Sequence, residues 1–111
     1  MRSEDRVRLR HIADALESVG RFVEGRRRED LDRDQMLVFA LVHALQIVGE
    51  AAGKMAAETR GRHPDIPWSM IIGMRHRLVH AYFDINLDIL GTTAAEAAPA
   101  LLAQVQRILA D

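Results

Sequence analysis

Residues 36–58, MLVFALVHALQIVGEAAGKMAAE, constrain the fold of this chain more than any other stretch. Apolar side chains occupy almost every direction around a helical wheel of this segment. A helix that is apolar nearly all round has to be covered on several sides. The stretch therefore predicts a helix inside a bundle and favours a second subunit that covers the rest. A narrow polar line interrupts it, made by His43, Gln46 and Glu50 at spacings of three and four.

The start and the end of this helix carry their own signals. Asp32, with Gln35 three residues later, resembles a capping box and predicts the beginning of the helix. Small residues gather near its end: Gly49, Ala51, Ala52 and Gly53. Glycine lowers helix propensity but lets another helix approach closely, so we expect close packing at this point.

Three further helices follow from the apolar periodicity. Residues 9–23 carry apolar side chains at steps of three and four, with Ser3 as a candidate N-cap and Gly25 as a left-handed terminator. The proline-rich joint TRGRHPDIPW separates the second helix from a third over residues 68–82, WSMIIGMRHRLVHAY. Residues 91–111 predict a last helix, which Pro99 either opens or kinks.

The 111 residues fit one domain, residues 1–111, and predict an all-α antiparallel bundle of four to five helices. The chain has no cysteine, which excludes disulfides and thiolate metal sites. The charged N-terminus does not resemble a signal peptide, and no stretch is expected to reach the ~20 apolar residues of a membrane span. We therefore expect a cytoplasmic protein without a membrane partner.

The formal net charge of −1 excludes a global basic field that would attract nucleic acid, so any such contact has to be local. Arg26, Arg27 and Arg28 form the densest basic cluster. Acidic residues follow directly within EDLDRD, which favours a solvated loop over an RNA-binding patch.

The third helix carries an unusual amount of ionisable chemistry. Arg75 falls in the middle of its apolar stripe, where an unpaired guanidinium costs several kcal/mol. Arg75 therefore has to extend its guanidinium to solvent, pair with a carboxylate such as Glu50, or line a polar cavity. The sequence pattern does not decide between a structural ion pair and a functional cavity. His80 lies roughly 140° round the wheel from Arg75, so one straight helix does not aim both at the same atom. Convergence requires a distorted helix or a site shared between two copies.

A metal site is a weaker interpretation of the same segment. His76, His80 and Asp84 recur every four residues and could share a helix face. The pattern lacks a further ligand, and exposed polar residues explain it better. We expect neither a metal nor a cofactor.

The pattern Arg75-x4-His80-x-Tyr82 resembles the Arg-x4-His-x-Tyr signature of the HepT-like toxins, a branch of the HEPN superfamily. The surrounding segments IVGEAAGKM, HPDIPWSMIIGMRHRLVHAYFDIN and APALLAQVQRIL resemble the same family in the same order. The resemblance covers roughly residues 5 to 110. One departure is His76, since the family usually has a small polar residue such as Asn or Asp after the arginine.

The resemblance implies an all-α HEPN fold, a homodimer with the Arg and His motifs at an interface cleft, and metal-independent endoribonuclease activity. It also implies a toxin role opposed by a minimal nucleotidyltransferase antitoxin, which adenylylates the motif tyrosine, here Tyr82. Arg75 and His80 are then the catalytic candidates. His76, Arg77 and Glu50 are candidates for supporting or substrate-binding roles.

The chemistry of the residues agrees with this expectation. Histidine titrates near pH 6.5 when unperturbed and serves as a general base or acid. Arginine clamps phosphate with a permanent charge. Such residues suit internal attack by a 2′-hydroxyl and predict a 2′,3′-cyclic phosphate product. Two alternatives remain open: a non-catalytic HEPN module that binds RNA or nucleotide or assists a nucleotidyltransferase, and a purely structural helical dimer.

Overall fold

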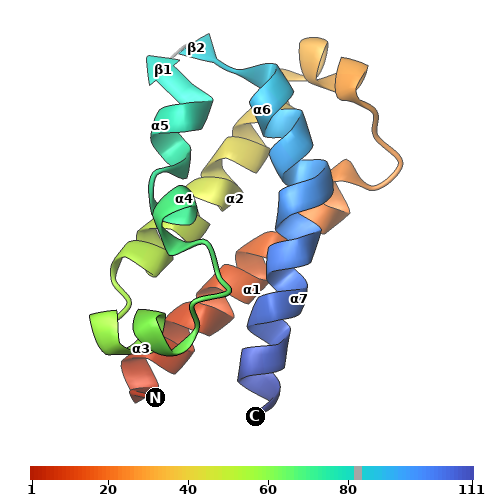
Figure 1. Ribbon diagram of the computed structural model, residues 1–111. Coiled ribbons are helices and arrows are strands. Elements are labelled where there is room, and N and C mark those ends of the chain that lie inside the picture. Colours follow the sequence, from red (N-terminus) through yellow and green to blue (C-terminus); the bar gives the residue numbers. More distant parts are fainter. Residues whose placement is uncertain (82–83) are drawn as a thin grey trace.

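The structure, a computed structural model, describes residues 1–81 and 84–111, and Figure 1 shows its arrangement. Helix α1 spans Ser3–Val23 and α2 spans Gln35–Gly53, joined by the short helix η1, Arg28–Asp32. The C-terminal half ends in a continuous helical run made of α6, Leu87–Thr92, the π-helical segment η2, Thr93–Ala97, and α7, Ala98–Ala110. The all-α prediction is confirmed.

Helices α2 and α7 both run antiparallel to α1 and lie next to it, as hydrogen bonds between their ends show. Arg6, near the start of α1, donates to the carbonyl oxygen of Leu109 at the end of α7 (2.6 Å). Asp5, one residue earlier, accepts from Thr59 and Ala56, just past the end of α2. The core between these helices is aliphatic, and full burial of each such side chain stabilises the fold by roughly 1.5–3 kcal/mol. Its most completely buried large members are Leu9, Ile12, Leu41, Leu45, Leu78 and Leu90.

Helix starts differ from the sequence prediction by one or two residues. Helix α1 begins at Ser3 itself, with Arg2 in the capping position and no side-chain cap. Helix α2 is capped by Asp34, whose carboxylate accepts from the Leu37 N–H at 3.1 Å. Asp32, the expected cap, lies in η1 and pairs with Arg28 instead. Gly25 takes the expected left-handed conformation after α1 (φ 71°).

The segment between α2 and α6 is more broken than the sequence predicted. Helix α2 ends at Gly53, and α3 covers Ala57–Arg62. The predicted third helix is three elements: α4, Trp68–Ile72, α5, Met74–Leu78, and strand β1, Val79–Ala81. Strand β1 pairs antiparallel with β2, Asp84–Ile85, in the register Val79 with Ile85 and Ala81 with Asp84. The indole N–H of Trp68 holds the preceding loop through the carbonyls of Arg60 and His63.

Pro99 lies in the first turn of α7, directly after the π-helical segment. Because proline has no backbone N–H, the carbonyl four residues earlier loses its α-helical partner. The wider turn of η2 precedes this position, and the helical run continues through it. Pro99 thus opens α7, as one of the two predicted alternatives had it, within a continuous helical run.

The 19-residue helix α2 is long and apolar enough to cross a membrane by length and composition alone, a test that the core helix of a folded bundle also passes. Eight of its residues are nonetheless buried in the fold. One stripe remains uncovered, at spacings of three and four: Met36, Phe39, His43, Ile47 and Glu50.

Candidate functional site

The sequence-predicted catalytic residues lie at one end of the molecule, where α5 passes into strand β1. Arg75 is in the first turn of the five-residue helix α5, and His80 is the central residue of β1. Both side chains are exposed. Neither forms an ion pair or a side-chain hydrogen bond with another residue in the described ranges.

The helical-wheel argument for Arg75 was wrong, because the helix on which it was drawn is not continuous. Gly73 ends α4 and starts α5 with φ −84° and ψ 3°, which breaks the α-helical path. The break changes the direction of every later side chain relative to α4. Ile71 and Leu78 are buried as the stripe predicted, but Arg75 between them is on the surface. The guanidinium therefore carries no burial cost.

The distortion expected near His80 is present. Helix α5 ends at Leu78, whose carbonyl oxygen accepts from the Asn86 N–H at 2.8 Å, and the chain continues as a strand. Asn86 then caps α6 by accepting from the Ile89 N–H at 3.0 Å. The wheel angle between Arg75 and His80 consequently has no meaning in this fold.

Glu50 does not support Arg75 as the sequence suggested. It accepts a hydrogen bond from the Gln46 side chain (3.0 Å) and lies in an open depression beside α1, with Arg8, His11 and Lys54 among its neighbours. The ion pair between Arg75 and Glu50 does not form. His43 is exposed on the uncovered stripe of α2 and does not join the α5 residues in any described cavity.

His76 and Arg77 complete the basic surface of α5, and only Arg77 lines a described cavity. His76 is exposed and lines no described cavity. Arg77 and Met74 both line a cavity of about 220 Å³ that lies between α4–α5 and α6–α7. The sequence named Arg77 but gave no signal for this cavity, because its walls come from segments far apart in the chain.

The suggested metal triad is not on one helix face. His76 belongs to α5, His80 to β1 and Asp84 to β2. Within the described ranges, no group of three or more His, Cys, Asp or Glu side chains is arranged to hold a metal ion. Tyr82, the predicted modification site, lies outside the described residues.

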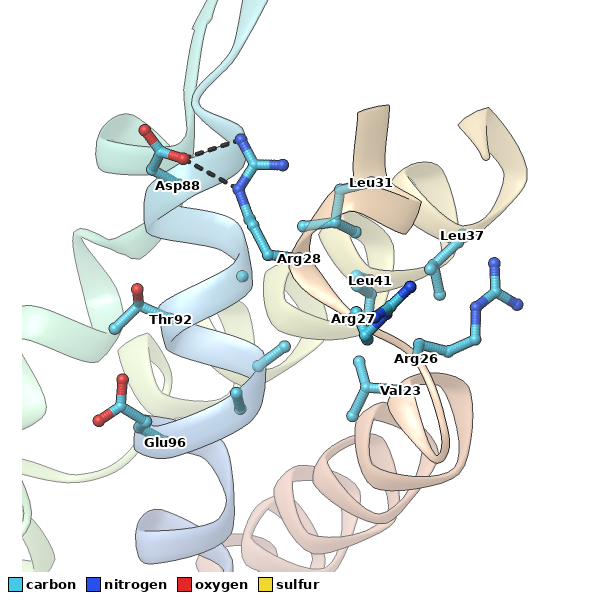
Figure 2. Close-up of a pocket in the computed structure, with 13 residues that line it drawn as sticks. Val23, Arg26, Arg27, Arg28, Leu31, Leu37, Leu41, Asp88, Thr92 and Glu96 are labelled. Carbon is cyan, nitrogen blue, oxygen red and sulfur yellow. Dashed lines mark hydrogen bonds and ion pairs between the residues drawn. The ribbon is translucent and has the colours of Figure 1, made fainter. Parts of the chain in front are cut away.

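The largest described cavity lies elsewhere, between the α1–α2 connection and α6–η2, and has a volume of about 460 Å³. Figure 2 shows its apolar lining residues, which include Val23, Leu31, Leu37 and Leu41, close to Arg26, Arg27 and Arg28. Arg28 crosses to α6 and binds Asp88 through Nε and Nη2 at 2.9 and 2.8 Å.

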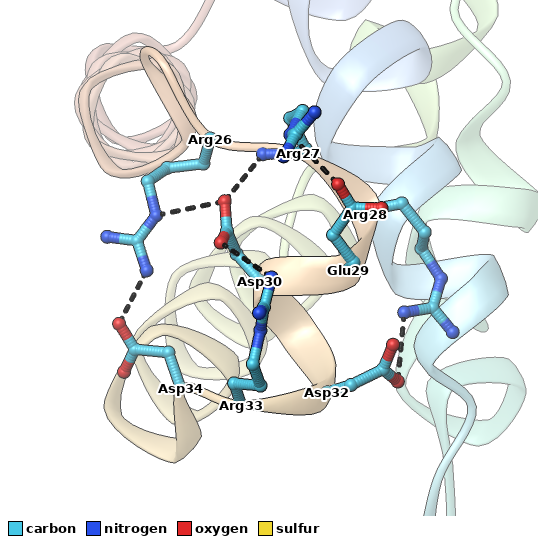
Figure 3. A network of polar contacts seen from close by, with 8 residues as sticks. All are labelled: Arg26, Arg27, Arg28, Glu29, Asp30, Asp32, Arg33 and Asp34. Atoms are coloured by element: carbon cyan, nitrogen blue, oxygen red, sulfur yellow. Dashed lines mark hydrogen bonds and ion pairs between the residues drawn. The ribbon is translucent and has the colours of Figure 1, made fainter.

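The arginine cluster is neutralised by its own neighbours, as the sequence favoured. Figure 3 shows Arg26 between Asp30 and Asp34, and Arg27 paired with Glu29 at 2.9 Å. The hydrogen bond from Arg26, followed by the Leu37 N–H, lowers the pKa of Asp34. The Arg27 N–H lowers the pKa of Asp30 against the opposing effect of burial. These guanidinium groups form an internal network that leaves little free positive charge for nucleic acid.

Comparison with known proteins adds a family to this geometry. A family model described as "Ribonuclease HepT-like" matches residues 12–108, which include the whole α4–β2 region. The chain belongs to the HepT-like ribonuclease family. The HEPN-type fold expected from the Arg75, His80 and Tyr82 pattern is thus confirmed.

Relatives of this HepT-like chain have similar length. A protein of Caldanaerobacter subterraneus subsp. tengcongensis, named "Putative RNase", is 39% identical over 91% of this chain and 90% of its own. A protein of Thermococcus cleftensis, named "Probable ribonuclease HepT", is 34% identical over 90% of this chain and 91% of its own. A Methanocaldococcus jannaschii protein named "Putative RNase" is 30% identical over 86% of this chain and 90% of its own. No solved structure matches the chain significantly.

Proposed function

We propose that this HepT-like chain is a metal-independent endoribonuclease whose catalytic groups are Arg75 and His80. The observation that carries the proposal is their placement: both are exposed on adjoining elements, α5 and β1, and no other described side chain engages them. An exposed arginine and an exposed histidine on consecutive elements, both without a side-chain partner in the described ranges, supply the two groups that RNA cleavage without a metal requires.

In the proposed reaction, an imidazole nitrogen of His80 removes the proton of a ribose 2′-hydroxyl. The 2′-oxygen attacks the adjacent phosphorus, and the bond from phosphorus to the 5′-oxygen of the next nucleotide breaks. That oxygen takes up a proton, and the products are a 2′,3′-cyclic phosphate and a free 5′-hydroxyl. Arg75 stabilises the charge that grows on the non-bridging oxygens through paired N–H donors.

The active form is proposed to be a homodimer. A single copy presents one Arg75 and one His80 on an open surface, and pairing two copies would exclude water from the motif. The uncovered stripe of α2 supplies apolar area for association: Met36 is 83% exposed and Phe39 is 55% exposed.

Regulation is proposed to follow the family pattern in the cytoplasm. The chain acts as a toxin, and a minimal nucleotidyltransferase antitoxin adenylylates Tyr82. The phenol oxygen attacks the α-phosphorus of ATP, pyrophosphate leaves, and the phenolic proton is released to solvent. The added adenylate brings bulk and negative charge close in sequence to His80, where it would compete with the RNA phosphate.

The decisive experiment compares the parent with His80→Ala and with His11→Ala, which removes a lone exposed histidine of α1. Growth arrest on expression and cleavage of a labelled RNA in the presence of a chelator are measured for each. We expect the parent and His11→Ala to cleave RNA to a cyclic phosphate and to arrest growth, and His80→Ala to do neither. A folded His80→Ala protein that cleaves as fast as the parent would refute the catalytic assignment.

The same measurements separate the alternative of a non-catalytic RNA-binding module. Purified parent protein that binds the RNA but leaves it intact would favour that alternative. For the antitoxin, intact-mass measurement after co-expression should show an adenylate increment that disappears in Tyr82→Phe. An increment that persists in Tyr82→Phe would place the modification on another residue.

A further inference from the structure

The cavity of about 220 Å³ that Arg77 lines has walls from the α4–α5 arm and from the α6–η2–α7 run. Figure 1 shows where these two segments lie in the fold. Leu16 of α1 and Leu45 of α2 contribute to the lining from beneath, and the side walls include Met74 and Leu101. The interior is therefore mostly aliphatic and thioether surface.

Polar groups also line this cavity. Arg77 is exposed, and its guanidinium has no ion pair within the described ranges. Thr92 and Thr93 lie on the opposite side, and each brings a hydroxyl that both donates and accepts hydrogen bonds. The cavity thus combines an apolar slot with one cation and two hydroxyl groups.

The hollow itself depends on the π-helical segment. Thr93 and Ala97 are the first and last residues of η2, and both line the cavity, as does Ala98. Alanine side chains leave this wall open where larger ones would fill it. Short π-helical segments inside α-helices occur frequently at functional sites.

We propose that this cavity binds one unpaired nucleobase of the RNA substrate, while Arg77 contacts the phosphate attached to that nucleotide. The proposal rests on the proposed ribonuclease function and names a determinant of its substrate class, single-stranded RNA. Sequence-specific recognition of RNA mostly targets unpaired bases that can be splayed out of the strand.

Size, chemistry and position favour this occupant. Drug-sized ligands take pockets of roughly 300–1,000 Å³, so a cavity of about 220 Å³ suits a smaller flat group. Methionine thioethers contact aromatic rings favourably, and Met70 and Met74 both line the cavity. Arg77 is two residues from Arg75 on the same short helix, so a base held here would keep its own phosphate close to α5.

The larger cavity beneath Arg26, Arg27 and Arg28 is a poorer candidate for RNA. Each of its arginines is already paired with at least one carboxylate. A phosphate would have to displace those partners, whereas Arg77 has none to displace within the described part of the chain.

The test fills the cavity from its rim. Ala97 is exposed and lines the cavity, so Ala97→Phe should occupy it without disturbing the core. Ala100→Phe is the matched control, because Ala100 is exposed on α7 and lines no described cavity. Ala97→Leu is a second filling variant in case the phenylalanine protein does not fold. Each full-length protein is assayed with a single-stranded RNA oligonucleotide and with a set of copies that lack one base at successive positions around the cleaved bond.

We expect one abasic position to raise the KM of the parent about tenfold or more, because the apolar surface that the base buries in the cavity is lost. Ala97→Phe should raise the KM for intact RNA by a similar factor and leave kcat nearly unchanged. This variant should have the same KM for intact RNA and for the abasic copy. Ala100→Phe should behave like the parent. A penalty for the abasic copy that persists in both filling variants would overturn the proposal. A second result would also overturn it: Ala97→Phe dissociates the dimer, but the dimer that remains has the KM of the parent. That result would indicate that a second copy of the chain, not a base, occupies the cavity.

The binding proposal is separable from the catalytic one. If the parent cleaves no RNA, the same labelled oligonucleotides are titrated by fluorescence anisotropy. Weaker binding of one abasic copy to the parent, absent in Ala97→Phe, supports the base pocket even though the ribonuclease proposal has failed. Equal affinity for all copies, or no binding of RNA, overturns the base pocket as well.

Discussion

The backbone of Ile71 lies directly against Gly49. A Cβ atom added to Gly49 would lie 3.0 Å from the Ile71 carbonyl oxygen, a tighter contact than nine in ten real Cβ atoms make. This contact sets the distance between α2 and α4, and α4 leads through Gly73 into the helix that carries Arg75. The small residue in the second helix is therefore part of what positions the candidate site.

Gly49→Ala should consequently destabilise the protein, although alanine is the better helix former. The added methyl group meets a backbone carbonyl, so α4 has to shift by a few tenths of an ångström. Overpacking of this kind costs about 1–3 kcal/mol. The gain in helix propensity offsets about 0.5–1 kcal/mol of that cost. We expect a net loss on the order of 1–2 kcal/mol in urea denaturation, together with slower RNA cleavage.

Gly20→Ala is the control for this prediction. Gly20 also lies inside a helix, α1, but an added Cβ atom would meet nothing within 4 Å. We expect this variant to be more stable than the parent by about 0.5–1 kcal/mol. If both variants gain stability, α4 does not pack on α2 as tightly as the structure shows.

Most of the fold could be predicted from the sequence because the long helices have strong local signals. The apolar periodicity of residues 9–23, the left-handed Gly25 and the small-residue packing at Gly49 all appear in the structure. The errors arose where the chain changes from one element to the next. Asp34 rather than Asp32 caps α2, because η1 extends to Asp32 and α2 begins directly after Asp34.

The geometry of the site was less predictable for the same reason. The sequence identified Arg75, His80 and Arg77, but it placed Arg75 in an apolar stripe on an unbroken helix. The helix breaks at Gly73 and ends at Leu78, where a strand follows, so the residues of the predicted stripe do not share one helix face. The cavity beside Arg77 has walls from six α-helices and from η2, and no local sequence pattern predicts such a surface.

Asp5 provides a prediction about stability and pH. Its carboxylate is fully buried and accepts from Thr59 Oγ1 at 2.5 Å, from the Ala56 N–H at 3.3 Å and from Arg8 at 3.1 Å. Burial acts to raise the pKa of Asp5, but these hydrogen bonds, that from Thr59 first, outweigh it and lower the pKa below the ordinary 3.8. The charged form therefore stabilises the fold.

Asp5→Asn should lower the free energy of unfolding by about 1–3 kcal/mol at neutral pH, because a buried donor loses its acceptor. A depressed folded-state pKa adds stability above the unfolded-state pKa, and that stability is lost as the pH falls through the folded-state pKa. The difference between parent and variant should thus be complete above about pH 5 and shrink below about pH 4. Thermal unfolding at a series of pH values measures it.

Asp14→Asn, an exposed position on the same helix, is the control for Asp5 and should change little at any pH. A difference between Asp5→Asn and the parent that stays constant down to pH 2 would show that the carboxylate charge does not contribute.

Arg75→Ala separates a structural from a functional arginine. Because the side chain is exposed, we expect the free energy of unfolding to stay within about 0.5 kcal/mol of the parent. RNA cleavage should fall about 10²–10³-fold, the usual effect of removing one donor to transition-state charge. Arg75→Lys should be intermediate, since lysine keeps the charge but loses the paired donors. A loss of several kcal/mol in Arg75→Ala with cleavage intact would restore the interpretation of a structural ion pair.

Phe39→Glu tests whether the site is shared between two copies. Phe39 is 55% exposed in the uncovered stripe of α2, so a buried glutamate there would oppose association without affecting the core. We expect the parent to be a dimer by light scattering and Phe39→Glu to be a folded monomer whose cleavage rate is at least tenfold lower at the same concentration.

Phe22→Glu is the matched control, because Phe22 is an aromatic residue of α1 that is 38% exposed and lies outside the stripe. It should remain dimeric and active. Full specific activity in a monomeric Phe39→Glu protein would show that one copy contains the whole site.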